Sequence, residues 1–297
     1  MKIIPFVARL RSAVTTSIGT VLERRGFYVQ DGAACGEATP LPAFGTEDLA
    51  TCEAVLRGAS TAFAPCAWHA LGQLELTRHG DPAVILAARA GVQLGGPDVA
   101  TSLLLQHNLD ALLELATTAR ATPVVKLKVV DPDATLALLW ALRARVPAPR
   151  LRLRLDLNGS LDEQQARAFL GALRDDDGVD LVEQPVPAGD VDGLCALARD
   201  QRVTIAADEA LIDPDARALL LAARAPLAFI WKPQAVGGAA VVVDAVIGRP
   251  ERVHIVTGFL DTVIAQTLAH ATARVVDAIT GVPRCHGLGT VAEAVLP

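Results

Sequence analysis

The sequence predicts an α/β protein, a parallel (β/α) barrel preceded by a small α+β domain, and three observations support this. From about residue 91 onward, short apolar runs alternate with helical segments. Five runs end in ionisable residues about one strand plus one helix apart, with steps of 28, 27, 25 and 24 residues between Lys128, Asp156, Glu183, Asp208 and Lys232. The chain has 297 residues, enough for an eightfold barrel of about 250 residues and one further domain.

The clearest predicted strand covers residues 151–158. Its leucines fall on one face and Arg152, Arg154, Asp156 and Asn158 on the other, which is the two-residue period of a strand. The other apolar runs predict strands over residues 124–130, 180–183, 203–209, 227–232 and 253–258. A parallel barrel gathers the carboxyl ends of its strands at one mouth, so we expect the five ionisable ends to meet there.

Helical segments separate these strands. They are predicted over residues 109–120, 132–145, 161–174, 191–200, 214–224, 238–246 and 261–274. Residues 92–94 are a weak candidate for the first barrel strand, and the pattern fades after residue 280 without fixing the last one.

Residues 1–90 do not show this alternation of strands and helices. We expect them to form the α+β domain, with the barrel over residues 91–290 and the C-terminal tail able to join the first domain. Residues 27–30 predict a strand, and Thr46 is expected to cap a helix over residues 47–57. A second helix is predicted over residues 62–78.

The composition excludes several classes of protein. The net charge of −6 argues against a surface for nucleic acid or anionic membranes. The five cysteines are scattered without a CxxC pair, which argues against a disulfide framework and a zinc site. Pro5 and Arg9 interrupt the first apolar run, and no uncharged apolar stretch reaches 18 residues, so we expect a cytoplasmic protein without membrane insertion.

The three predicted carboxylates point to a metal site. Asp156, Glu183 and Asp208 would repel one another at one mouth unless a divalent cation lay among them. Oxygen ligands without cysteine or histidine suit Mg²⁺, and Mn²⁺ is expected to substitute for it.

The lysines point to proton transfer. Lys126 and Lys128 are two apart on a strand and share a face. Repulsion and burial lower a lysine pKa, so one of them is expected to fall from about 10.4 toward about 7 to 8 and act as a base. Together with Lys232 and a metal, such a base would remove a proton α to a carboxylate, which predicts a small-molecule carboxylate substrate.

The ordered motifs resemble the enolase superfamily in its muconate-cycloisomerase subgroup, and within it the o-succinylbenzoate synthases of menaquinone biosynthesis. They are Lys-x-Lys at 126–128, Asp-x-Asn-Gly at 156–159, Glu-x-Pro at 183–185, Asp-Glu at 208–209 and Lys-Pro at 232–233. The segment 36–44 is similar to a Gly-Glu-x-x-Pro-Leu-Pro loop of the family's capping domain. The resemblance implies a barrel of the modified TIM type with an α+β capping domain.

The resemblance also implies a role for each motif residue. Lys128 would be the base and Lys232 the cation that stabilises an enediolate. Asp156, Glu183 and Asp208 would hold Mg²⁺, supported by the neighbouring side chains Lys126, Asn158 and Glu209. The implied substrate-binding residues are Arg154, Thr257, Gly258 and Gly287, and a specificity loop is expected near residues 14–20. The implied reaction is the dehydration of 2-succinyl-6-hydroxy-2,4-cyclohexadiene-1-carboxylate to 2-succinylbenzoate.

Other interpretations stay open at this point. The same two lysines suit an N-succinylamino-acid racemase or another enzyme of the muconate-cycloisomerase type, and Lys232 alone would suit a Schiff-base aldolase. Lys232 can also simply pair with Asp208 or Glu209, and the chain can be a non-catalytic barrel. The sequence favours neither a structural nor a functional role for His286, and it does not predict the oligomeric state.

Overall fold

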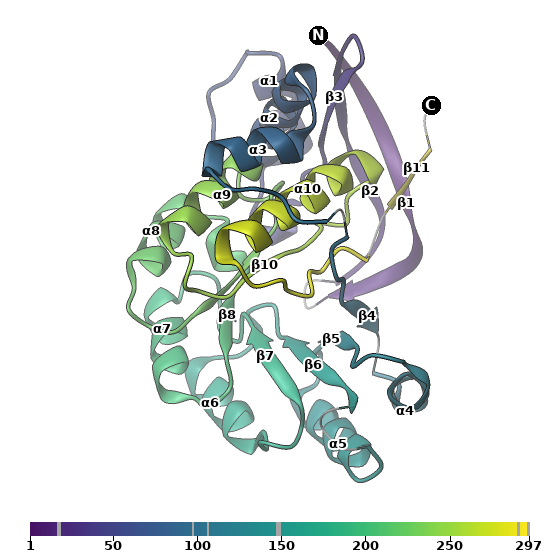
Figure 1. The fold of residues 1–297 in the computed structure, drawn as a ribbon, viewed down its shortest axis with the longest axis vertical. Helices are drawn as coiled ribbons and strands as arrows, with labels where there is room; N and C mark the ends of the chain where they lie inside the picture. The colour runs from purple at the N-terminus through teal and green to yellow at the C-terminus, as the bar shows by residue number, and fades with distance from the viewer. Residues whose placement is uncertain (17–18, 97, 106, 147–149, 290–291, 296–297) are drawn as a thin grey trace.

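The computed structural model describes residues 1–16, 19–96, 98–105, 107–146, 150–289 and 292–295. Two sheets organise them (Figure 1): an antiparallel sheet built from the two ends of the chain and a curved parallel sheet built from its middle. The α/β fold with a (β/α) barrel and an N-terminal α+β part is therefore confirmed.

The antiparallel sheet has the strand order β11-β1-β2-β3. β1 (Lys2–Thr16) and β2 (Gly19–Asp31) form a long hairpin, β3 (Ala34–Ala38) follows, and β11 (Ala292–Val295) pairs with β1 near Arg9. Residues 27–30 lie in β2 as predicted, whereas β1 was not foreseen because its first residues carry no clear alternation.

Three helices follow this sheet in the chain: α1 (Leu49–Leu56) and α2 (Pro65–His79) pack on it, whereas α3 (Pro82–Ala90) packs against α2, α9 and α10. The predicted cap of the first helix was wrong, because Asp48 accepts from the Thr51 amide while Thr46 accepts from the Leu41 amide. α3 was not predicted. α2 packs directly on β3 at Gly36, where a Cβ would collide with the backbone of Ala70.

The parallel sheet has the order β10-β9-β8-β7-β6-β5-β4. Its strands are β4 (Leu103–Leu105), β5 (Val124–Lys128), β6 (Arg152–Asp156), β7 (Val179–Glu183), β8 (Ile205–Ala207), β9 (Ala228–Trp231) and β10 (His254–Val256). The helices between and after them are α4 (Leu109–Thr118), α5 (Pro132–Arg143), α6 (Glu163–Ala172), α7 (Val191–Asp200), α8 (Pro214–Ala222), α9 (Ala239–Gly248) and α10 (Val263–Thr280). The short 3-10 helices are η1 (Pro42–Phe44) and η3 (Glu209–Leu211). The predicted strand over residues 92–94 was wrong, because the first strand of this sheet is β4.

The barrel closes between β10 and β4 through a short segment rather than a regular strand. Isolated parallel bridges join Thr257 to Gly287 and Thr101 to His286. The backbone of residues 286–287 therefore lies where a last barrel strand would lie, a position that the sequence pattern did not fix.

The core confirms the alternation seen in the sequence. Leu151, Leu153, Leu155 and Leu157 are fully buried in the main hydrophobic cluster between sheet and helices. Small and aliphatic side chains such as Ala206, Ala228 and Ile230 fill a second cluster. Among the described residues, no helix is both long and apolar enough to cross a membrane.

Candidate active site

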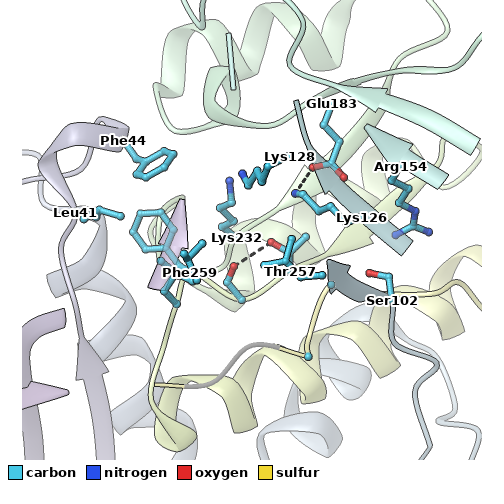
Figure 2. A pocket seen from close by; sticks show the side chains of 16 residues that line it. Leu41, Phe44, Ser102, Lys126, Lys128, Arg154, Glu183, Lys232, Thr257 and Phe259 are labelled. Carbon is cyan, nitrogen blue, oxygen red and sulfur yellow. Dashed lines mark hydrogen bonds and ion pairs between the residues drawn. The ribbon is translucent and has the colours of Figure 1, made fainter. Parts of the chain in front are cut away.

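A pocket opens at the carboxyl ends of the barrel strands and faces the antiparallel sheet (Figure 2). In the close view, Leu41 and Phe44 lie at one end of the pocket, and Arg154 lies at the other end. Three lysines, Lys126, Lys128 and Lys232, lie between these ends. The parallel arrangement therefore brings together side chains that are far apart in the sequence.

Three buried carboxylates converge beside the lysines. Asp156 ends β6, Glu183 ends β7 and Asp208 follows β8, and each is at most 2% exposed. One oxygen from each lies within 4.8 Å of the others. A divalent cation that prefers oxygen ligands fits such a set, because without counter-charge the three carboxylates repel one another in a buried site.

The lysines supply counter-charge in this structure. Lys126 Nζ lies 2.8 Å from Asp156 Oδ2 and also contacts Glu183. Lys128 Nζ lies 2.5 Å from the same Asp156 oxygen, and Lys232 Nζ lies 2.5 Å from Asp208. The simple pairing of Lys232 with Asp208 is thus present, but within a shared cluster rather than as an isolated pair.

These contacts decide the titration of the amines. Burial disfavours the charged form of Lys126, but Asp156, Glu183 and Asp208 outweigh burial and raise its pKa well above the usual value. Burial is likewise outweighed at Lys232, where Asp208 and Glu209 raise the pKa. At Lys126, contacts with carboxylates that the sequence did not reveal outweigh the expected repulsion between the neighbouring lysines.

The carboxylates respond in opposite directions. The pKa of Asp156 lies below its usual value because Lys126 and Lys128 outweigh the effect of burial. Burial raises the pKa of Asp208, and burial together with Asp208 raises that of Glu209. The three lysines face four carboxylates, so the cluster carries one net negative charge when every group is ionised.

A surrounding layer of side chains holds this cluster in place. Asn158 Oδ1 accepts from Lys128 Nζ at 2.9 Å, and Asn158 Nδ2 donates to Glu209 Oε1 at 2.9 Å. Gln184 Oε1 accepts from the Asp208 amide at 2.9 Å and from the Ala210 amide at 3.2 Å. Gln184 has a φ of 39°, a left-handed conformation that is unusual for this residue type and typical of functional sites. No role for Gln184 was predicted from the sequence.

The predicted substrate-binding residues also line the pocket. Arg154, Thr257, Gly258 and Gly287 all face it. Arg154 is 3% exposed, and its Nε has no hydrogen-bond partner among the described protein atoms, with Asp180 Oδ2 at 3.5 Å. A buried guanidinium with a free donor beside a cavity is equipped to bind an anion.

Sequence reasoning missed most of the apolar wall. Phe44 and Phe259 meet edge to face with ring centroids 6.3 Å apart, and Lys232 Nζ lies 6.0 Å from the Phe44 ring. Val14, from the expected specificity loop, also lines the pocket, whereas residues 17–18 of that loop lie outside the described residues. Leu41 also lines the pocket; it lies in the 36–44 segment noted in the sequence, which had not been assigned to the pocket. Further lining residues without a sequence signal are Ser102, Leu104, Leu260 and Gly289.

Comparison with known proteins agrees with this geometry. Residues 109–246 match the family described as "Enolase C-terminal domain-like". A relative named o-succinylbenzoate synthase, from Thermosynechococcus vestitus, is 29% identical over 229 residues, which are 68% of this chain and 66% of that protein. The chain thus matches just under two thirds of that relative's length.

Solved structures resemble the whole chain. The o-succinylbenzoate synthase from Thermosynechococcus elongatus BP-1, described with Mg in its active site, superimposes with a TM-score of 0.72 at 24% identity, covering 96% of this chain and 91% of that one. The L-Ala-D/L-Glu epimerase from Bacillus subtilis gives a TM-score of 0.77 at 19% identity, covering 99% and 98%. These likenesses establish the fold, and residues 109–246 of this chain are similar to the enolase C-terminal domain-like family.

Proposed function

We propose that this protein is an o-succinylbenzoate synthase that dehydrates 2-succinyl-6-hydroxy-2,4-cyclohexadiene-1-carboxylate to 2-succinylbenzoate with Mg²⁺. The observation that carries the proposal is the convergence of Lys128 and Lys232 with three buried carboxylates in one pocket. The named relative that matches 68% of the chain supports the choice of reaction.

Asp156, Glu183 and Asp208 would hold the Mg²⁺. Their fit rests on burial and on one oxygen from each lying within 4.8 Å of the others, a set of oxygen ligands that suits a divalent cation. When bound, the metal supplies positive charge that offsets both the three carboxylates and a carboxylate of the substrate.

Lys128 and Lys232 would divide the proton chemistry. Neutral Lys128 would take the proton α to the substrate carboxylate, and the ammonium of Lys232 would stabilise the enediolate. The proton then held at Lys128 Nζ is available to the departing hydroxyl, so water leaves and the ring becomes aromatic. Asn158 and Glu209 would keep the two lysines in place through the contacts described above.

The lining of the pocket favours an anionic substrate with an apolar body. Among the described lining residues, four side chains are cationic and only Glu183 is acidic, whereas leucine and phenylalanine form much of the remaining wall. A dipeptide carries a free ammonium group, which this lining does not complement. The dipeptide epimerase fold neighbours are therefore a weaker guide to the substrate than the synthase.

A second candidate is an N-succinylamino-acid racemase. It is favoured by the presence of two lysines in one pocket, which suits removal of a proton by one and its return by the other. A Schiff-base aldolase is less favoured, because Lys232 contacts Asp208 and has a raised pKa, whereas a nucleophilic lysine must be neutral.

An ultraviolet assay for 2-succinylbenzoate tests the proposal. We expect the purified protein to form the product with Mg²⁺, to lose activity after EDTA treatment and to regain it with Mg²⁺ or Mn²⁺. Incubation of an N-succinylamino acid in D₂O, followed by α-deuterium content, tests the racemase. Absence of product in the first assay, with deuterium uptake in the second, would overturn the synthase assignment in favour of the racemase.

A further inference from the structure

His286 is a fully buried histidine at the place where the barrel closes without a regular strand. Its main chain pairs with the β4 side, since its amide donates to the Ala100 carbonyl at 2.7 Å and its carbonyl accepts from the Ser102 amide at 2.7 Å. Ser102 Oγ also donates to that carbonyl at 3.2 Å. Ser102 lines the pocket, so one side of His286 already fixes part of the wall.

The imidazole ring of His286 contacts β10, on the other side of the closing segment from β4. The Val256 amide, on the outer edge of β10, donates to His286 Nδ1 at 2.9 Å. A regular last strand would supply a carbonyl for this buried donor, and a buried amide without an acceptor destabilises the fold. The ring nitrogen therefore replaces a missing backbone acceptor.

Asp277 orients the ring for this task. Its Oδ1 lies 3.1 Å from His286 Nε2 and also accepts from the Arg284 amide at 3.1 Å. Because Nδ1 accepts a hydrogen bond, the neutral ring carries its proton on Nε2 and donates it to Asp277. The carboxylate on α10 thus fixes both the tautomer and the angle of the ring.

The next residue transmits this placement to the pocket. The Gly287 amide donates to the Val256 carbonyl at 2.8 Å, and the Gly258 amide donates to the Gly287 carbonyl at 3.1 Å. A Cβ at Gly287 would lie 2.9 Å from Thr257 Cβ, so these two lining residues are in tight contact. A shift of residue 286 would therefore move Thr257, Gly258 and Gly287 together.

We propose that His286, oriented by Asp277, is a positioning residue that sets the substrate-binding wall formed by Thr257, Gly258 and Gly287. It does not reach the reacting atoms. Its role is to join β10 to the closing segment, so it governs how tightly the substrate is held rather than how fast the proton moves. The binding part of this inference rests on the proposed function, and the placement of the wall does not.

Two measurements on matched variants test it. H286L removes both ring contacts, H286N keeps an acceptor near the Nδ1 position, and H254L is the control. His254 is an equally buried histidine on β10, the strand that carries Val256. Its ring contacts Trp231 Nε1 and the Arg249 carbonyl, and neither residue lines the pocket. D277A provides a second route to the same loss should H286L fail to fold.

The first measurement needs no substrate. We expect amide hydrogen exchange in a peptide spanning residues 254–260 to accelerate about tenfold or more in H286L, less in H286N, and little in H254L. Exchange in H286L equal to that of the wild type would overturn the proposal even if the enzyme assignment held.

The second measurement is the split between KM and kcat for 2-succinyl-6-hydroxy-2,4-cyclohexadiene-1-carboxylate. We expect H286L to raise KM about tenfold while kcat stays within about threefold, and H286N to recover most of the loss. An unchanged KM beside accelerated exchange would overturn the binding role. An inactive wild type would overturn the proposed function instead, and hydrogen exchange would still decide whether His286 places the wall.

Discussion

Two regions of this molecule bury charged side chains, and they satisfy them in different ways. One is the cluster of lysines and carboxylates at the barrel mouth. The other lies between the antiparallel sheet and the barrel, where Arg24, Glu37 and Asp261 are each at most 2% exposed. The first cluster lines the pocket, and the second does not.

In the second region, fixed donors hold the two carboxylates, whereas Arg24 donates to the Thr39 carbonyl. Glu37 accepts from the Thr262 amide at 2.9 Å and the Ala265 amide at 3.0 Å, so a residue of β3 caps the amino end of α10. Asp261 accepts from Gln234 Nε2 at 2.7 Å and from the Phe259 amide at 2.8 Å. Backbone amides and a helix terminus cannot change partner without unfolding the element that carries them.

At the mouth, flexible ammonium groups hold the charges instead. A lysine side chain has a flexible stem of four carbons, so its ammonium can leave a carboxylate without movement of the backbone. The carboxylate can then bind a metal, and the ammonium can contact a substrate. Burial alone therefore does not mark a functional charge. What marks it is a partner that can be exchanged, beside a cavity.

The largest expected effect is on Lys128. We expect K128A to lower kcat about 10³- to 10⁴-fold because the base is removed, while thermal stability changes little. The ultraviolet assay and a thermal melt measure the two quantities. The control is K2A, because Lys2 is an exposed lysine of β1. Full activity of K128A would show that Lys128 is not the base.

The second effect concerns metal affinity. E183Q should weaken Mg²⁺ binding at least about 100-fold, because one charged ligand of three is lost. Isothermal titration with Mg²⁺ alone measures it, without any substrate. E163Q, in an exposed pair with Arg167, is the matched control, and equal Mg²⁺ affinity in both variants would contradict the metal assignment.

The third effect tests the structural region. E37Q places an amide opposite the Thr262 and Ala265 N–H groups, so we expect a loss of about 2 to 3 kcal/mol in the free energy of unfolding. Urea denaturation measures it. E23Q, in an exposed pair on the same sheet, should change stability by less than about 0.5 kcal/mol. Loss of kcat without loss of stability in E37Q would mean that this charge is also functional.

The smallest effect is a pH dependence at Asp261. Burial, together with Glu37, raises its pKa to about 7 from the ordinary 3.8. Between about pH 4 and pH 7 the folded state then binds more protons at this site than the unfolded state, so its contribution to stability is lost as pH rises through that window. We expect wild type to lose on the order of 2 kcal/mol relative to D261N between pH 5 and pH 8. Urea denaturation of both proteins at both pH values measures the difference. A gain in the stability of the wild type at the higher pH would contradict the raised pKa of Asp261.

The sequence predicted the barrel and its charged mouth well because both follow local rules. The alternation around Asp156 gave the face of β6, and regular spacing placed Glu183 and Asp208 at neighbouring strand ends. The closing segment escaped prediction because an isolated bridge needs no periodicity. His286 acts through one ring nitrogen, which accepts from a backbone amide thirty residues away, and a single sequence gives no sign of such a contact.

The part of the pocket wall formed by Leu41 and Phe44 was not predicted, for another reason. Phe44 and Leu41 reach the pocket only because η1 and its flanking turn place them there, and apolar residues in a loop look the same whether they face a ligand or a core. The raised pKa of Lys126 was not foreseen, because spacing revealed its lysine neighbour but not the two carboxylates that its ammonium contacts.

The pairing of β11 with β1 constrains how the chain is assembled on the ribosome. Val7 to Leu10 pair with Val295 to Ala292, more than 280 residues further along the sequence. One edge of β1 therefore stays unpaired while nearly three hundred residues are synthesised, and the barrel can form before the sheet that roofs it is complete.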